Sequence, residues 1–130
     1  MSEITIQDMR SWKCRPDKCD PNSLVIFLAQ LAQLLQQYKL DQYTQINITP
    51  PLDIDAGRNV LFNIYIEVFV SDQSGNVLIP LPLAVIKVTA DRNWVIYTYS
   101  YPATRQVENI IHTFVLKYFN AEPIQEETYT

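Results

Sequence analysis

The chain has 130 residues, of which 10 are basic and 14 acidic, giving a formal net charge of −4. This length supports one domain with its own core and excludes two independent cores. The hydrophobic fraction of 48% and the charged fraction of 18% are typical of a globular protein. Only two glycines occur, which excludes a glycine-rich phosphate-binding loop.

The acidic balance argues against nucleic-acid binding, which needs a basic surface to neutralise phosphates. The one local excess of basic residues, between Arg10 and Lys18, is interleaved with aspartates. The first ten residues are polar and lack the apolar segment of an export signal, and the longest apolar stretch, 24–35, is too short to span a membrane. We therefore predict a cytoplasmic protein that binds no membrane and keeps Cys14 and Cys19 reduced.

The chain begins with a predicted short edge strand at Ile4 and Ile6, followed by a polar loop. A helix is predicted over 21–40, because Asp20 can cap its N-terminus and Pro21 suits the first helical position. This helix presents one apolar stripe at the spacing of a helix face, formed by Leu24, Phe27, Leu28, Leu31, Leu34, Leu35 and Tyr38.

Three apolar runs joined by short turns predict an antiparallel meander of strands, and they cover 60–70, 77–89 and 94–99. In the first run, Asn63 and Glu67 mark the side that we expect to meet water at least partly. In the second, Pro80 and Pro82 cannot donate ladder hydrogen bonds, so they indicate an unpaired edge or a bulge. The alternating segment 43–48 is a candidate for a further strand.

A second helix is predicted with an apolar stripe formed by Val107, Ile110, Ile111, Phe114 and Tyr118, and with Asn120 as its stop. The fold class is therefore α+β, an antiparallel meander of three to five strands packed with two amphipathic helices around a helix-strand-strand-strand-helix core. We predict a single domain over 1–120, followed by an acidic mobile tail over 121–130. The domain divides into an N-terminal strand and loop segment (1–20), a helix (21–40), the meander (60–100) and a helix (102–120).

Cys14 and Cys19 leave three alternatives, which are structural thiols, a redox pair or disulfide, and ligands of a metal site. A structural zinc site needs four ligands, and the only histidine, His112, lies on a different element. We therefore favour structural thiols and expect no metal and no cofactor. Asp53 and Asp55 stand two apart in a loop, which is too few ligands for a calcium site.

His112 follows Glu108 by four residues on the predicted second helix, so the two side chains can touch. A glutamate–histidine pair can perform general acid–base chemistry or form a plain surface contact. Because no serine or cysteine is placed beside it as a nucleophile, we favour the surface contact. Whether the protein is an enzyme stays open, with the balance against catalysis.

Aromatic residues are the most unusual feature, with eight tyrosines, five phenylalanines and two tryptophans. Tyr97, Tyr99 and Tyr101 alternate on one side of the last strand, and Tyr65 and Phe69 can occupy a matching face. Such stripes bind single-stranded nucleic acid where basic residues accompany them, and here they do not. We therefore predict that the stripes are core and protein interface.

The leading hypothesis is a non-enzymatic protein-interaction module, accessory or chaperone-like, whose partner is another protein or a second copy in a homodimer. The alternative is a small-molecule-binding domain or small enzyme with a pocket between sheet and helices. A regulator that binds an acidic or nucleic-acid partner through 10–18 ranks last. The candidate ligand or interface residues are Tyr65, Trp94, Tyr97, Tyr99 and His112.

The predicted order of helix, three strands and helix over 20–120 resembles part of the fold of small acidic secretion chaperones and their relatives. The resemblance concerns the order of elements and includes no motif residue. It implies an accessory protein that binds another protein.

Overall fold

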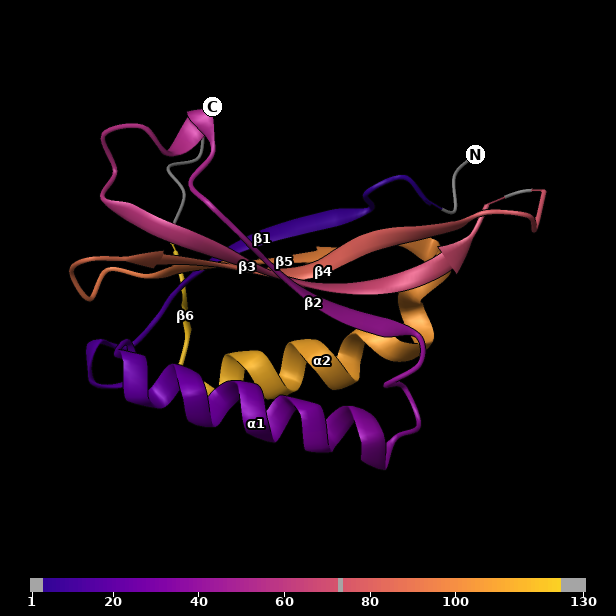
Figure 1. Ribbon diagram of the computed structural model, residues 1–130, viewed down its shortest axis with the longest axis horizontal. Helices are drawn as coiled ribbons and strands as arrows, with labels where there is room; N and C mark the ends of the chain where they lie inside the picture. The colour runs from indigo at the N-terminus through magenta and orange to yellow at the C-terminus, as the bar shows by residue number, and fades with distance from the viewer. Residues whose placement is uncertain (1–3, 73, 125–130) are drawn as a thin grey trace.

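A computed structural model describes residues 4–72 and 74–124 as one antiparallel sheet with two helices packed on the same face (Figure 1). The helices are α1 (Pro21–Gln37) and α2 (Arg105–Tyr118). The strands are β1 (Asp8–Lys13), β2 (Thr44–Thr49), β3 (Val60–Ser71), β4 (Leu78–Thr89), β5 (Val95–Ser100) and β6 (Glu122–Pro123). The α+β class and the antiparallel sheet predicted from the sequence are thus confirmed.

The sheet has six strands in the order β2-β3-β4-β5-β1-β6, rather than the predicted three to five. Four strands, not three, lie between the helices along the chain, so the predicted helix-strand-strand-strand-helix core is wrong in its count. The candidate strand at 43–48 exists as β2, paired along its length with β3. The short strand predicted at Ile4 and Ile6 is wrong, because the N-terminal strand β1 begins only at Asp8 and runs into the segment predicted as loop.

β1 was predicted in part as loop because its sequence is polar and mixed in charge. Its pairing with β5, from Asp8 opposite Ser100 to Lys13 opposite Val95, holds it in the sheet. The indole Nε1 of Trp12 also donates to Thr98 Oγ1 at 2.9 Å. These contacts join residues more than eighty positions apart, and therefore they lie outside any local sequence pattern.

Pro80 and Pro82 lie both at an unpaired edge and beside a bulge, which are the two alternatives predicted from the sequence. β5 pairs with β4 only from Ala84 to Lys87, so among the described residues no strand pairs on that side with the half of β4 that carries the prolines. A register shift follows at once, because Glu67 lies opposite Pro82 while Ile66 lies opposite Ala84. The prolines therefore cost no ladder hydrogen bond, and the intervening bulge gives β4 its extra residue.

α1 begins as its sequence predicts, since the Asp20 side chain accepts a hydrogen bond from Ser23 N at 2.9 Å and Pro21 opens the helix. It ends at Gln37, three residues before the predicted Leu40. Asn120, the predicted stop of α2, adopts a positive φ of 47° just after the helix. The predicted tail is partly structured, because Glu122 and Pro123 pair with β1 as β6. Residues 125–130 lie outside the described part of the chain.

One apolar core fills the space between the sheet and the helices, and Phe27 of α1 lies at its centre. The Phe27 ring is fully buried and stacks on Phe114 of α2 with ring centroids 5.6 Å apart. It also contacts Tyr118 and Phe119, at 5.3 and 4.8 Å. This aromatic cluster joins the two helices beneath the sheet.

Replacing Phe27 with alanine should therefore lower the free energy of unfolding by about 3–5 kcal/mol, the usual cost of removing a buried aromatic side chain. Chemical denaturation followed by circular dichroism measures it. Ile26→Ala is the matched control, because Ile26 is the next residue and is 50% exposed; it should cost less than about 1 kcal/mol. Equal losses in the two variants would contradict the central role of Phe27.

Candidate functional site: the aromatic sheet face

The sheet face opposite the helices carries three of the five predicted site residues. Ile64 and Ile66 of β3 point into the core, so the alternating Tyr65 points to the other face. Tyr65 lies opposite Val85, and Val85 lies opposite Tyr97 on the next strand. Val85 is only 3% exposed although it is not part of the core beneath the helices. The two tyrosines thus flank and bury an apolar residue on the open face.

Tyr99 extends this row toward β1, where it lies opposite Met9. Burial raises the pKa of the Tyr99 hydroxyl, and the nearby Tyr97 and Tyr65 raise it further. The three tyrosines are therefore close enough to influence one another electrostatically. We call the surface formed by Tyr65, Phe69, Val85, Tyr97 and Tyr99 the aromatic face.

Two buried polar groups adjoin the aromatic face. Glu67 is 8% exposed, and its carboxylate accepts a hydrogen bond from Gln45 Nε2 at 2.8 Å. The Tyr101 hydroxyl donates to the carbonyl oxygen of Pro82 at 2.9 Å. Burial raises the pKa of Tyr101 to about 12, with further contributions from Tyr99 and from Glu67. Tyr101 is consequently a neutral hydrogen-bond donor at any physiological pH.

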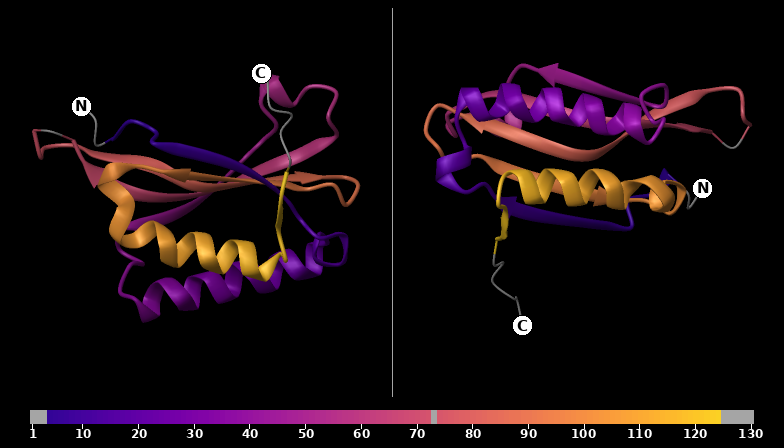
Figure 2. Two further views of the ribbon diagram at one scale, coloured as in Figure 1. Left: turned by 180° about the vertical axis from the view of Figure 1, so that it is seen from behind. Right: turned by 90° about the horizontal axis from the view of Figure 1, so that it is seen from below.

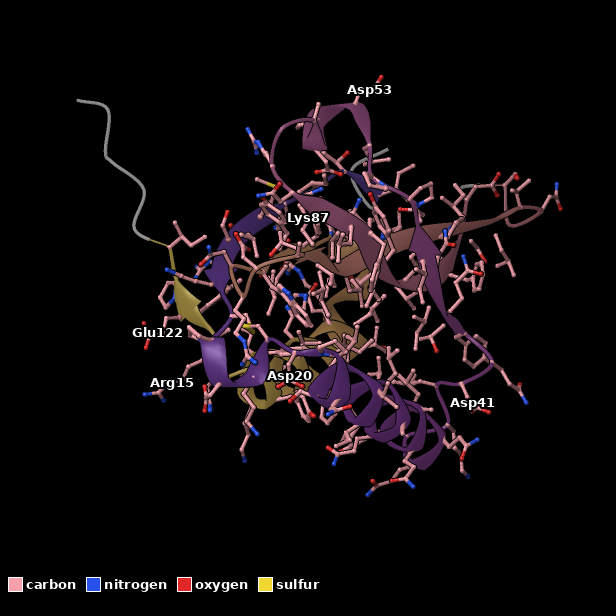
Figure 3. The ribbon with its side chains drawn as sticks, turned by 60° about the vertical axis from the view of Figure 1, so that its left-hand side comes forward. Arg15, Asp20, Asp41, Asp53, Lys87 and Glu122 are labelled. Carbon is pink, nitrogen blue, oxygen red and sulfur yellow. A yellow bond between two sulfur atoms is a disulfide. The ribbon has the colours of Figure 1, made fainter. Side chains whose placement is uncertain are left out.

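The loop between β2 and β3 covers the other end of the open face and is held there by a buried ion pair. Figure 3 shows Lys87 on the sheet beneath the loop that carries Asp53. The Lys87 ammonium lies 2.7 Å from Asp55 Oδ1 and donates to Asn63 Oδ1 at 3.1 Å. Asp55 Oδ2 accepts from Asn63 Nδ2 at 3.0 Å and from the backbone N–H of Leu52 at 2.8 Å. Every member of this network has a partner, as buried polar groups require.

This network was not predicted from the sequence, and the water exposure predicted for two residues near it is wrong. Asn63 and Glu67 were predicted to mark a water-facing side, but they are 0% and 8% exposed. The loop and the tyrosines bury them. A signal for the network was available in Lys87, which is the only charged residue in the apolar run 77–89, since a lone cation in such a strand needs an anionic partner.

Trp94 and His112 lie apart from the aromatic face. Trp94 is 2% exposed, and its Nε1 donates to the carbonyl of Thr89 at 3.2 Å. His112 places Nε2 2.9 Å from the carbonyl oxygen of Leu83. No hydrogen bond joins His112 to Glu108, which instead accepts from Thr104 Oγ1 at 2.9 Å. Among the described residues the predicted glutamate–histidine contact is therefore not formed.

Trp94 does line a pocket of about 310 Å³ between the start of α1 and the ends of β3 and β4. Its walls are mainly apolar, with Leu24, Phe62 and Val88 beside the indole. The acidic and basic side chains of Asp91 and Arg92 also line it. The pocket is large enough for a small organic molecule.

The two cysteines form a disulfide, with an S–S distance of 2.05 Å between Cys14 and Cys19. The expectation of reduced thiols is thus wrong. Both residues are buried, at 1% and 2% exposure, where the chain turns from β1 toward α1. Disulfides are rare in reducing compartments, so this bond weighs against the predicted cytoplasmic location. In residues 4–72 and 74–124, no three histidine, cysteine or acidic side chains gather in a way that could hold a metal ion.

No protein-family model, curated protein or solved structure matches the chain. Neither helix within the described ranges combines the length and the apolar content needed to cross a lipid bilayer.

The ion pair beneath the loop should make stability depend on pH. Burial by itself raises the pKa of Asp55, but hydrogen bonds from Lys87, Asn63 and the Leu52 N–H outweigh it and lower this pKa to about 2. Because the pKa of the unfolded chain is higher, the stabilisation is complete above about pH 4 and is lost as the pH falls toward about 2.

Asp55→Asn should therefore lower the free energy of unfolding at neutral pH by about 2 kcal/mol, the scale of hydrogen bonds to a charged group. It should also flatten the decline of stability between about pH 4 and about pH 2. Urea unfolding at a series of pH values measures both effects. Asp53→Asn is the control, since Asp53 is exposed in the same loop; a pH profile changed equally by both substitutions would disprove the assignment.

Proposed function

We propose that the protein is a non-enzymatic interaction module, accessory or chaperone-like, whose aromatic face binds a segment of another protein. The observation that carries this proposal is the aromatic face itself, which the helices leave uncovered. Tyrosine is enriched where proteins meet, because its ring supplies large contact area and its hydroxyl stays hydrogen-bonded. Tyr65, Tyr97 and Tyr99 gather there on two strands that flank β4.

The chemistry of the partner segment follows from Glu67. This carboxylate is 8% exposed and is hydrogen-bonded to the neutral amide of Gln45, and no ion pair within the described residues involves it. Asp55, on the same side of the sheet, has the ammonium of Lys87 for that purpose. A buried carboxylate is stabilised by a cation. The segment that fits this face is therefore apolar or aromatic and carries a basic side chain.

A lysine in place of Tyr97 should abolish this binding, because it removes a central ring and places a positive charge where the basic segment docks. The test begins with a protein captured by the purified chain from an extract of the source cells, followed by titration of the two purified components. Tyr97→Lys should weaken the dissociation constant at least about tenfold, a loss of about 1.4 kcal/mol.

Gln106→Lys provides the control for that titration, since it adds the same charge at an exposed position on α2, on the opposite side of the molecule. It should leave the affinity unchanged. Circular dichroism establishes that both variants are folded. Equal binding by Tyr97→Lys and the unchanged chain would overturn the proposal that this face is the binding surface.

A second candidate function rests on the pocket beside Trp94, which is apolar apart from its charged rim. We propose it as the site of a small aromatic or aliphatic ligand, with indole as the first probe. A ligand that binds only the folded state raises the melting temperature. Indole should therefore stabilise the chain in a thermal-shift assay, and Ala90→Phe, which fills the pocket, should abolish that stabilisation. The same stabilisation in both would place the ligand elsewhere.

A further inference from the structure

The two edges of the sheet differ in how they are protected. β6 ends one side with two residues, a glutamate and a proline, beside a β1 strand that carries Asp8, Arg10 and Lys13. Short strands, charges and prolines are the usual means of preventing edge-to-edge pairing. β2 forms the other edge with the sequence TQINIT. This strand has six residues and contains no charged residue and no proline. Thr44, Ile46 and Ile48, which are all β-branched, lie on its helix side.

The backbone of β2 presents its free hydrogen-bonding groups at defined residues. Phe69 N donates to Tyr43 O at 2.8 Å, so the odd-numbered residues of the strand turn their N–H and C=O groups toward β3. Thr44, Ile46 and Ile48 consequently direct theirs outward. Ile48 is also 56% exposed, so its side chain is accessible at this edge.

α1 continues this unprotected edge below the sheet. In Figure 2, α1 lies under the β2 side of the sheet and α2 under the side toward β1. The flank of α1 that meets α2 contains Phe27, whose ring stacks there. A different flank, turned outward, contains Val25, Ala29, Ala32 and Gln36, which are all exposed and recur at helical spacing.

These two surfaces carry no charge at all. Residues 21–38 and 42–52 contain no lysine, arginine, aspartate or glutamate. At the chain-wide charged fraction of 18%, about three charges would be expected in the first of these ranges alone, because an exposed helix face is ordinarily charged. We call the outward side of β2 and the outward flank of α1 the neutral edge.

We propose that the neutral edge is the interface of a symmetric dimer, in which β2 of one chain pairs antiparallel with β2 of a second copy. A two-fold interface brings each patch against its own copy, so any charge on it meets the same charge. An uncharged edge avoids this repulsion, and glutamine and asparagine amides can both donate and accept across it. A partner selected by charge would instead require charges on this surface.

The register of the pairing follows from the outward-facing residues. The side chains of directly paired residues in an antiparallel sheet point to the same face. If the helices of both copies lie on one side of the sheet, even-numbered residues of β2 must therefore pair with even-numbered residues of the second β2. Placing Ile46 opposite Ile46 of the second copy pairs Thr44 with Ile48, and every outward N–H and C=O group of the three finds a partner. The two α1 helices then face each other through Val25, Ala29 and Ala32, and the small alanines permit a close approach.

Analytical ultracentrifugation tests the assembly. At about 100 µM, where a dimer with a micromolar dissociation constant is populated, the unchanged chain should sediment as a species of twice its 15.1 kDa mass. Ile48→Lys should convert it to a monomer, because a lysine on the edge strand meets apolar surface and blocks pairing. Leu78→Lys is the control, since Leu78 is 64% exposed at the start of β4; it should remain dimeric.

Cross-linking tests the register. The two residues of a hydrogen-bonded antiparallel pair have Cα atoms about 5.5 Å apart, within the span of a disulfide. Ile46→Cys should therefore form a covalent dimer under mild oxidation. Ile48→Cys should not, because position 48 lies opposite Thr44 of the second copy, four residues from position 48 of that copy. The reverse pattern, a monomeric unchanged chain, or a dimer unaffected by Ile48→Lys would each overturn the proposal. Tyr97→Lys should leave the dimer intact, so loss of the dimer in that variant would assign it to the aromatic face instead.

Discussion

The two helices cover the sheet on one side only (Figure 1), and the remaining structure depends on this constraint. The Phe27 cluster joins α1 to α2 beneath one face, and the described residues include no third α-helix to cover the other. The central strands β3, β4 and β5, which are the most apolar of the six, thus present a second face toward water. The rings of the aromatic face are half-buried and Val85 between them is buried, so this face offers partly covered aromatic rings and not bare apolar surface.

The open face has different arrangements at its two ends for groups that the helices do not cover. Where the β2–β3 loop folds over, Asp55 and Lys87 neutralise each other and Asn63 satisfies both. At the other end, the surface consists of tyrosines of β3 and β5, which flank Val85 and whose hydroxyl groups can remain hydrated. Glu67 lies on this second side with one amide partner. The fully compensated end serves the fold, and the incompletely compensated end is where binding can gain the most free energy.

Local patterns predicted most elements because each is specified by its own residues. Asp20 and Pro21 begin α1, Asn120 ends α2, and the alternating run 60–70 is β3. What the sequence could not supply depends on contacts between distant residues. The polar strand β1 is fixed by β5, and Glu108 is bonded to Thr104 rather than to His112.

The candidate site shows the same division between local and distant information. Period-two alternation placed Tyr65, Tyr97 and Tyr99 on a common face, as the register has them. Alternation predicts the face on which a side chain lies but not the loop that covers it, so the burial of Asn63 and Glu67 could not be predicted from the sequence pattern. Trp94 is buried against Phe119, which is the ordinary place of tryptophan in a core, and so it lies apart from the tyrosines.

The proposed dimer would change what the aromatic face can recognise. A two-fold axis perpendicular to the sheet keeps both pairs of helices on one side, so both aromatic faces would lie on the other side of one continuous sheet. A partner with two apolar, basic segments could then engage both faces at once. The second contact would form at the effective concentration set by the link between the segments, so modest affinity at each face would give tight binding overall. The edge and the face would thereby act together, since the neutral edge fixes the spacing and the aromatic face supplies the contacts.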